Sequence, residues 1–141
     1  MRLPDPEPGL VVRYDFLWSS DAKAGRKSGK ERPVCLVAAL DSDTDPQFVV
    51  FLPITHSKPK GKAKGIEIPA KVGARLGLDA ERAWVIVSEF NVDDWPNAGL
   101  APVPGRTRQF AYGFLPPGLF AKVKTAFLTV HEAGQTKQVR R

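Results

Sequence analysis

KERPVCLVAALDSDTDPQFVVFLPITH, residues 30–56, contains two apolar runs, 34–40 and 48–52, separated by a short segment rich in Asp. Apolar runs on either side of a polar turn are typical of two antiparallel strands joined by a loop. In such a hairpin the start of the first strand lies beside the end of the second. The pattern therefore predicts that Arg32 lies close to Thr55 and His56 in space, although it is distant from them in sequence.

The rest of the chain also has a mainly β pattern. Apolar and polar residues alternate over 10–18, and short runs of β-branched or aromatic residues occur at 65–69 and 83–90. After Pro116, apolar residues recur at helical spacing. We therefore predict an α+β fold that is mainly β, a small half-open barrel of about five to seven strands with a C-terminal amphipathic helix.

Length and composition favour one domain. The chain has 141 residues, of which 43% are hydrophobic, enough for one core. We expect a single domain over 1–141, with flexible ends at 1–8 and 135–141. Cys35 is the only cysteine, which excludes an internal disulfide and fits a reducing compartment. The first residues do not resemble a signal peptide and no apolar run is as long as a membrane span, so the expected location is cytoplasmic, with no membrane partner.

Positive charge is concentrated in two loops beside the hairpin. The segment 19–30 holds four basic residues and one acid, and the segment 56–65 holds four lysines and no acid. Together the two loops carry more positive charge than the chain's net charge of +6. Mobile lysines around a concave site would attract a polyanion, and the alternative interpretation is that they are solvated loops that aid solubility.

The sequence contains few residues that bind metal ions through nitrogen or sulfur. His56 and His131 are its only histidines, and neither lies in a cluster with Cys35 or with a group of acids. Metal sites need several such ligands at suitable spacing. We therefore expect neither a metal ion nor another cofactor.

The order of these features resembles the PemK/MazF family of toxin endoribonucleases from bacterial toxin–antitoxin pairs. The resemblance lies in Val12-Arg13-Tyr14-Asp15-Phe16, the basic loop that follows, Arg32-Pro33 at the start of an apolar strand, and Pro53-Ile54-Thr55 at the end of the next strand. It covers about the first two-fifths of the chain clearly, and the rest only as architecture. It implies a compact SH3-like barrel, a homodimer, an antitoxin partner, and cleavage of single-stranded RNA without a metal ion.

Cleavage of RNA without a metal ion uses the neighbouring 2′-hydroxyl as nucleophile, so the protein must stabilise negative charge on the phosphate and move protons. Arg32 fits the first task because a guanidinium grips two phosphate oxygens, and Thr55 would orient the phosphate or the ribose. His56 is the candidate for proton transfer, and Glu89 stands where many family members carry an acid. The adjacent basic residue of the family is missing at Glu89.

The predicted RNA-binding residues lie in the two basic loops and in the segment after 90. They are Lys27, Lys30, Lys58, Lys60, Lys62 and Trp95, with the indole ring of Trp95 stacking on a base or else anchoring its loop.

Other interpretations of the same residues stay open at this point. Arg32 could simply pair with Asp15 or Glu31 at a strand end, and Thr55 could cap its loop through the hydroxyl. A catalytically weak or silent barrel that binds RNA or a partner peptide would carry the same basic loops. A scaffold protein whose charge only aids solubility would show no salt-dependent RNA binding.

Overall fold

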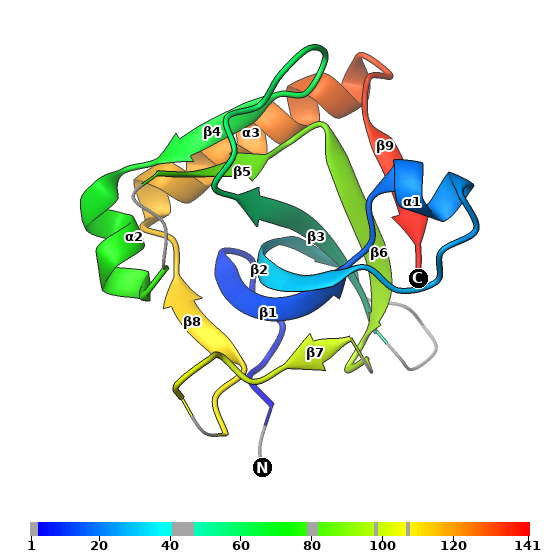
Figure 1. Cartoon of the computed structure of the whole chain (residues 1–141). Coiled ribbons are helices and arrows are strands. Elements are labelled where there is room, and N and C mark those ends of the chain that lie inside the picture. Colours follow the sequence, from blue (N-terminus) through cyan, green and yellow to red (C-terminus); the bar gives the residue numbers. More distant parts are fainter. Residues whose placement is uncertain (1–2, 41–46, 79–81, 98, 107) are drawn as a thin grey trace.

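A computed structural model describes residues 3–40, 47–78, 82–97, 99–106 and 108–141 of the chain (Figure 1). The described residues form a small half-open barrel of the α+β class, as predicted. The nine strands and three helices are, in chain order, β1 (Leu10–Phe16), α1 (Ser19–Lys23), β2 (Lys30–Leu40), β3 (Gln47–Thr55), β4 (Gly65–Ile68), α2 (Ala70–Leu76), β5 (Ala83–Ile86), β6 (Glu89–Trp95), β7 (Leu100–Ala101), β8 (Ala111–Phe114), α3 (Pro117–Glu132) and β9 (Lys137–Arg140). The structure has more strands than the five to seven predicted, because the predicted strand 83–90 divides into β5 and β6, and because β7, β8 and β9 are too short or too polar to give a clear alternating pattern.

The strands form one bent sheet that does not close. Its main path runs β4-β5-β3-β2-β1-β7, while β6 pairs with β3 and β8 pairs with β1. Because β1 and β3 bond to different neighbours along their lengths, the sheet curves around its core (Figure 1). The pairing of β6 with β9 is parallel, whereas the pairings along the main path are antiparallel.

The hairpin predicted from residues 30–56 is confirmed. β2 and β3 pair antiparallel, with Val34 opposite Pro53. Continued outward by two residues, this register brings Arg32 opposite Thr55 at the open end of the hairpin. β3 ends at Thr55, so the strand rule that sends neighbouring side chains to opposite faces no longer applies to His56. The predicted turn at 41–46 lies outside the described residues.

The segment 83–90, predicted as one strand, is two strands with a bend at Val87 and Ser88. The backbone N–H of Val87 donates to the carbonyl of Lys64 at 2.9 Å, and the Ser88 hydroxyl accepts the Lys64 N–H at 3.0 Å. The Ser88 carbonyl in turn accepts the N–H of Lys137. These bonds to the basic loop and to the chain end turn the backbone from β5 into β6, where a run of apolar letters suggested continuity.

The stretch 135–141, predicted as a flexible end, is instead part of the sheet. It contains β9, which pairs with β6 in the register Glu89 to Lys137 and Val92 to Arg140. The sequence of β9, KQVR, does not indicate a strand because it is mostly polar and only Val139 is buried. At the other end, residues 3–8 have no regular secondary structure, and residues 1–2 lie outside the described part.

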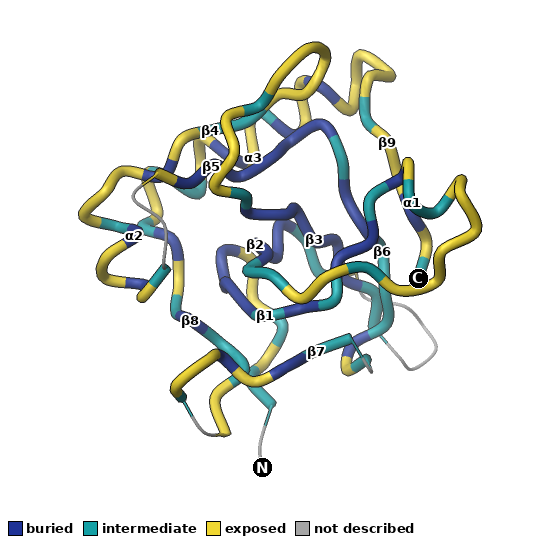
Figure 2. The backbone as a smooth tube through the Cα atoms, in the orientation of Figure 1, coloured by how far each residue is buried: buried dark blue, intermediate teal, exposed yellow. Residues whose placement is uncertain are grey.

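The buried residues form two apolar clusters. Most residues of the central strands β1 and β3 are buried (Figure 2). One cluster joins β2, β3 and β5 to Val123, Phe127 and Val130, the buried residues of α3, which carries the predicted amphipathic pattern. The other lies under β1 and contains Tyr14 and Phe16. Among the helices of the described residues, α3 included, none has both the length and the hydropathy that crossing a membrane requires.

The buried Cys35 thiol should make stability depend on pH in alkaline solution. Burial raises its pKa to about 12, whereas the pKa of an unfolded thiol is about 8.5. Between these values the unfolded state holds fewer protons, so the free energy of unfolding should fall with rising pH by about 1.4 kcal/mol per pH unit from this group. Urea denaturation of the protein and of Cys35→Ala should show this slope as their difference. Equal pH dependence of the free energy of unfolding in the two proteins would contradict a raised pKa of Cys35 in the folded state.

Candidate functional site

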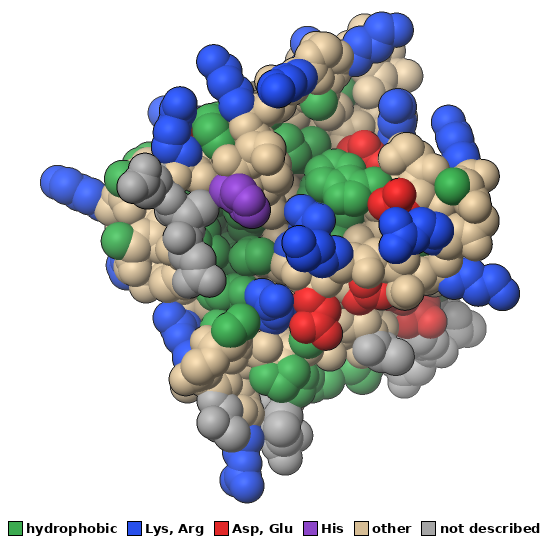
Figure 3. Space-filling model, viewed as in Figure 1, with side chains coloured by type: hydrophobic (Ala, Val, Ile, Leu, Met, Phe, Trp, Pro, Cys, Tyr) green, Lys and Arg blue, Asp and Glu red, His purple; other side chains and the backbone are tan. Residues whose placement is uncertain are grey.

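The open end of the β2–β3 hairpin borders a pocket of about 330 Å³. Its polar lining comes from Arg13, Lys30, Glu31, Arg32, Thr55, His56 and Tyr112, and its apolar lining from Pro33, Ile54, Leu78, Ala83, Val103 and Pro104. The view into this face shows a histidine at the edge of an apolar hollow, with basic side chains around the rim (Figure 3). The structure therefore brings Arg32, Thr55 and His56 to one concave surface, as the hairpin predicted.

Arg32 is the half-buried cation of this pocket. Its Nε is buried and has no hydrogen-bond partner among the described residues. Burial lowers the pKa of the guanidinium, and the charge of Asp21 acts in the opposite direction. An arginine stays protonated despite such a shift, so the pocket holds a positive charge with unused donors. A buried donor without a partner is costly, and an anionic ligand would relieve that cost.

Trp18 holds the guanidinium from the side. The Arg32 Cζ atom lies 5.3 Å from the centre of the indole ring, within the range of a cation–π interaction. Trp18 lies two residues after the end of β1 and packs edge-on against Phe16, with ring centres 5.2 Å apart. The alternative interpretation, a pairing of Arg32 with Asp15 or Glu31, is not what the structure shows, because Asp15 pairs with Arg141 and Glu31 with Arg13. Arg32 is thus oriented by an aromatic face and, among the described residues, forms no ion pair with a carboxylate.

Thr55 and His56 also line the pocket. The Thr55 Oγ1 atom accepts the backbone N–H of Ser57 at 3.2 Å, so the hydroxyl does cap its loop. That bond uses a lone pair of the oxygen and leaves the hydroxyl hydrogen for a ligand. His56 is exposed and lines the same pocket. An exposed imidazole can exchange protons with solvent and with a bound substrate.

Glu89 is not part of this pocket, in contrast to the prediction. Its Oε1 atom accepts the backbone N–H of Ser19 at 2.5 Å, at the start of α1. The bend at Ser88 accounts for the difference, since it places Glu89 at the beginning of β6, beside β9, and not at the end of a strand that reaches the pocket. The carboxylate therefore anchors α1, the helix next to Trp18.

Trp95 is a core residue and not an RNA-stacking residue. Its side chain is 7% exposed and lies in the cluster under β1, with its ring centre 6.4 Å from that of Phe51. It is the last residue of β6, where it pairs with Gln47. The acidic and proline-rich sequence around Trp95 suggested an exposed loop, but strand pairing with β3 turns the indole inward.

The predicted lysines are exposed, and the structure separates them into two groups. Lys30, at the start of β2, lines the pocket. Lys27, Lys58, Lys60 and Lys62 are exposed in the two loops and do not line it. Basic side chains project around the face that holds the hollow (Figure 3). Their arrangement suits long-range attraction of a polyanion better than contact with one group inside the pocket.

Sequence reasoning missed a second polar group in the pocket, formed by Arg13, Glu31 and Tyr112. The Arg13 Nε atom lies 3.5 Å from the Glu31 Oε1 atom, and its Nη1 donates to the Tyr112 hydroxyl at 3.1 Å. Arg13 sits opposite Pro33 in the β1–β2 register, so a prediction of that pairing would have placed it near Arg32. Tyr112 lies on β8, a strand too short to be found from its sequence pattern.

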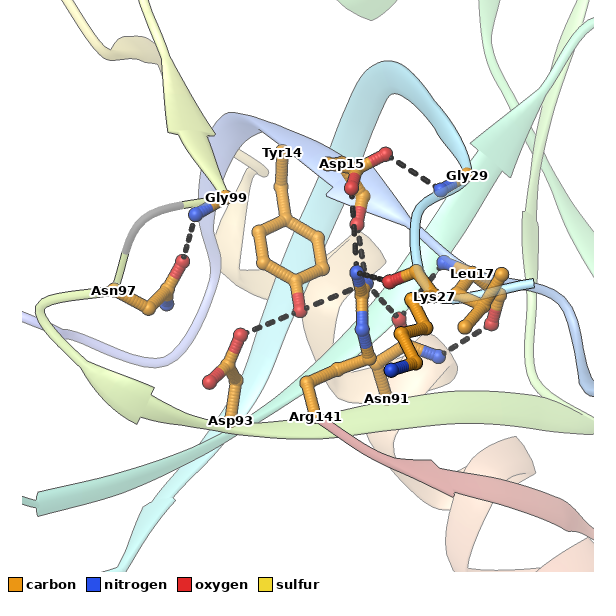
Figure 4. A network of polar contacts seen from close by, with 10 residues as sticks. All are labelled: Tyr14, Asp15, Leu17, Lys27, Gly29, Asn91, Asp93, Asn97, Gly99 and Arg141. Atoms are coloured by element: carbon orange, nitrogen blue, oxygen red, sulfur yellow. Dashed lines mark hydrogen bonds and ion pairs between the residues drawn. The ribbon is translucent and has the colours of Figure 1, made fainter. Parts of the chain in front are cut away.

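A partly buried network of polar contacts fixes the basic loop that leads into β2 (Figure 4). The Asp15 carboxylate accepts the N–H of Gly29 at 2.8 Å and lies 3.2 Å from Arg141 Nη2, which also donates to the Lys27 carbonyl at 3.3 Å. A Cβ atom on Gly29 would overlap the carbonyl oxygen of Phe16, so glycine is required there. The loop before Lys30 is thus tied to β1 and to the chain end.

The same network buries Tyr14 and Asn91 beneath the loop. The Tyr14 hydroxyl donates to Asp93 at 2.7 Å, and burial, followed by this hydrogen bond, raises the tyrosine pKa well above its usual range. The side chain of Asn91 exchanges two hydrogen bonds with the backbone of Leu17, at 2.9 and 2.8 Å. Both residues serve to hold β1 against β6, the strand that carries β9.

No protein-family model matches this sequence, and no curated protein is significantly similar to it. The described residues contain no group of three or more His, Cys, Asp and Glu side chains positioned to hold a metal ion. The chemistry of the pocket follows from its own residues. It combines a guanidinium with unused donors, a hydroxyl, an imidazole and an apolar interior, a set that suits an anionic ligand with an apolar part.

Proposed function

We propose that this protein is an endoribonuclease that cleaves single-stranded RNA through attack of a 2′-hydroxyl on the adjacent phosphate. The observation that carries the proposal is the buried, unpartnered Nε of Arg32 in a pocket that also contains Thr55 and His56. The resemblance to PemK/MazF toxins, borne by the same Arg32 and Thr55, further supports the proposal. It extends the proposal to the toxin of a toxin–antitoxin pair, with growth inhibition as its effect.

The pocket residues divide the chemical tasks of this reaction. Arg32 donates two hydrogen bonds to the phosphate oxygens and stabilises the charge that builds on them as the 2′-oxygen attacks. Thr55 donates its hydroxyl hydrogen to a phosphate oxygen or to the ribose, which holds the attacking and leaving oxygens in line. His56 carries out one of the two proton transfers, either from the 2′-hydroxyl or to the 5′-oxygen that leaves. No metal ion is required for these steps.

The basic loops supply the attraction for the RNA chain. Lys30 borders the pocket, while Lys27, Lys58, Lys60 and Lys62 extend the positive surface beyond it. Contacts of this kind are independent of base sequence and weaken steeply with salt. The proposed antitoxin, a protein with an acidic segment, would compete with RNA for this surface. The proposed homodimer would place two such surfaces in one particle.

The reaction is tested with a long single-stranded RNA in EDTA. We expect cleavage to fragments that end in a 2′,3′-cyclic phosphate, and no cleavage of the same sequence carrying 2′-O-methyl groups. His56→Ala should slow the reaction by about a hundredfold or more, as expected for loss of an acid–base group. His131→Ala is the matched control, because His131 lies on α3 and contacts Thr136 and Phe127. Intact RNA with the unaltered protein would overturn the proposal.

A second candidate, a barrel that binds RNA or a peptide without cleaving it, is favoured by the position of Glu89. The predicted acid is engaged at the start of α1 and does not contribute to the pocket. In this case the unaltered protein would bind RNA in a salt-dependent way and leave it intact. Fluorescence anisotropy at increasing salt, run beside the cleavage assay, separates the two functions. Growth arrest on expression, relieved by a neighbouring gene for an acidic protein, would support the toxin role.

A further inference from the structure

The pocket is larger and more apolar than phosphate binding requires. Its volume of about 330 Å³ falls at the lower end of small-molecule pockets, which span about 300–1,000 Å³. Six of its lining residues are apolar, and they come from β2, β3, β5 and the segments that follow α2 and β7. A flat apolar group fits such walls, because its faces lose contact with water on both sides. The phosphate at Arg32 therefore accounts for only part of the pocket.

The polar group Arg13, Glu31 and Tyr112 gives the rest of the pocket a defined hydrogen-bonding pattern. Arg13 uses two of its five donors within the described residues, one on Glu31 and one on the Tyr112 hydroxyl. Tyr112 is buried, and the Arg13 side chain is 21% exposed, so these two are held firmly. Glu31 is 56% exposed at its side chain, and its second oxygen makes no hydrogen bond to the described residues. The remaining donors of Arg13 and the second carboxylate oxygen of Glu31, an acceptor, thus lie side by side in the pocket.

We propose that this pocket is a nucleobase subsite that selects guanine next to the scissile phosphate. The edge of guanine presents N7 and O6 as acceptors, followed by the ring N1–H and the N2 amino group as donors. Arg13 would donate to O6 and N7, which is the commonest arginine contact to this base. The Glu31 carboxylate would accept from N1 and N2. The apolar walls would hold the two faces of the ring.

The other bases match this pair of side chains less well. Adenine carries an amino group where guanine has O6, so this donor would face the donors of Arg13. Its N1 has no hydrogen, so this acceptor would face the Glu31 carboxylate, which is also an acceptor. Cytosine and uracil present at most one donor next to an acceptor. Only guanine offers two adjacent donors to a carboxylate. A mismatch of this kind typically lowers affinity by about tenfold to a hundredfold.

The inference rests on the proposed binding of RNA but not on its cleavage. Its test therefore uses uncleavable ligands, namely short fluorescent 2′-O-methyl oligouridylates with one central guanine, inosine or adenine. Inosine keeps O6, N7 and the N1 donor and lacks the N2 amine. We expect the guanine ligand to bind at least about tenfold more tightly than the adenine ligand, with inosine between them.

Glu31→Gln is the variant that isolates the carboxylate. The amide has one acceptor in place of two, so the ratio of guanine to adenine affinity should fall to within about threefold. The ratio is the relevant quantity, because loss of a negative charge strengthens binding of every RNA. Glu67→Gln is the matched control, since Glu67 is an exposed carboxylate paired with Arg82 outside the pocket. It should leave the ratio unchanged.

The outcomes separate this inference from the proposed function. Guanine-selective binding without any cleavage would support the subsite and overturn the nuclease. Cleavage together with equal affinity for guanine, inosine and adenine would overturn the subsite and support the nuclease. An unchanged ratio of guanine to adenine affinity in Glu31→Gln would also overturn the subsite. Failure of every oligonucleotide to bind would overturn the subsite, and intact RNA in the cleavage assay would overturn the nuclease as well.

Discussion

Arg32→Ala is expected to reduce the rate of RNA cleavage about a hundredfold to a thousandfold, the loss seen when one preorganised donor to a developing charge is removed. The effect should be this large because Arg32 is the half-buried cation of the pocket and its Nε has no partner among the described residues. Single-turnover cleavage with excess protein measures the chemical step directly. The affinity for uncleavable RNA should fall much less, since the exposed lysines remain.

Two further variants sharpen this result. Arg32→Lys keeps the charge but cannot grip two oxygens at once, so it should recover only a small part of the rate. Arg82→Ala removes an exposed arginine that pairs with Glu67 and lies over Trp84, away from the pocket, and should cleave at the unaltered rate. Equal rates for Arg32→Ala and the unaltered protein would remove Arg32 from the mechanism.

Asn91→Ala should give a large loss of stability, about 2–5 kcal/mol in the free energy of unfolding. Its side chain is 0% exposed and satisfies both the N–H and the carbonyl of Leu17, and it also accepts a hydrogen bond from Arg141 at 3.1 Å. Truncation would leave buried backbone groups without partners, each at a cost of about 1–3 kcal/mol. Urea denaturation followed by circular dichroism measures the change.

Asn97→Ala provides the comparison for Asn91→Ala. The Asn97 side chain likewise bridges two backbone groups, the carbonyl of Asp94 and the N–H of Gly99, but it is only partly buried. Water can replace these bonds after truncation, so the loss should stay near about 1 kcal/mol. Similar losses for the two variants would show that burial does not set the cost of the Asn91 network.

The parts of the fold that were predicted correctly rest on local patterns. The two apolar runs around a polar turn specify β2 and β3, and their antiparallel pairing then places Arg32 beside Thr55 without further information. Helix α3 follows from apolar spacing after Pro116 in the same way. In each case neighbouring residues carry the signal, because a strand or a helix repeats every few residues.

The features that were missed depend on contacts between distant segments. The sequence of β9 has one buried residue and reads as polar, yet it pairs with β6 more than forty residues earlier. Trp95 is turned inward by pairing with Gln47, and Glu89 is held by the backbone of Ser19. Patterns among neighbouring residues do not indicate which distant residues will be their partners. The pocket itself shows the same division, since Arg32 and Thr55 were located from the hairpin while Tyr112 arrives from β8.

The parallel pairing of β9 with β6 returns the end of the chain to the sheet after α3. Strand β9 covers an edge of β6 that no earlier segment pairs with among the described residues. Without the end of the chain, this edge of β6 would keep unpaired N–H and carbonyl groups, and Asp15 and Asn91 would lack the guanidinium of Arg141. Unpaired strand edges are sites of aggregation. A chain shortened before 137 would therefore keep the pocket residues and lose the strand that protects the sheet.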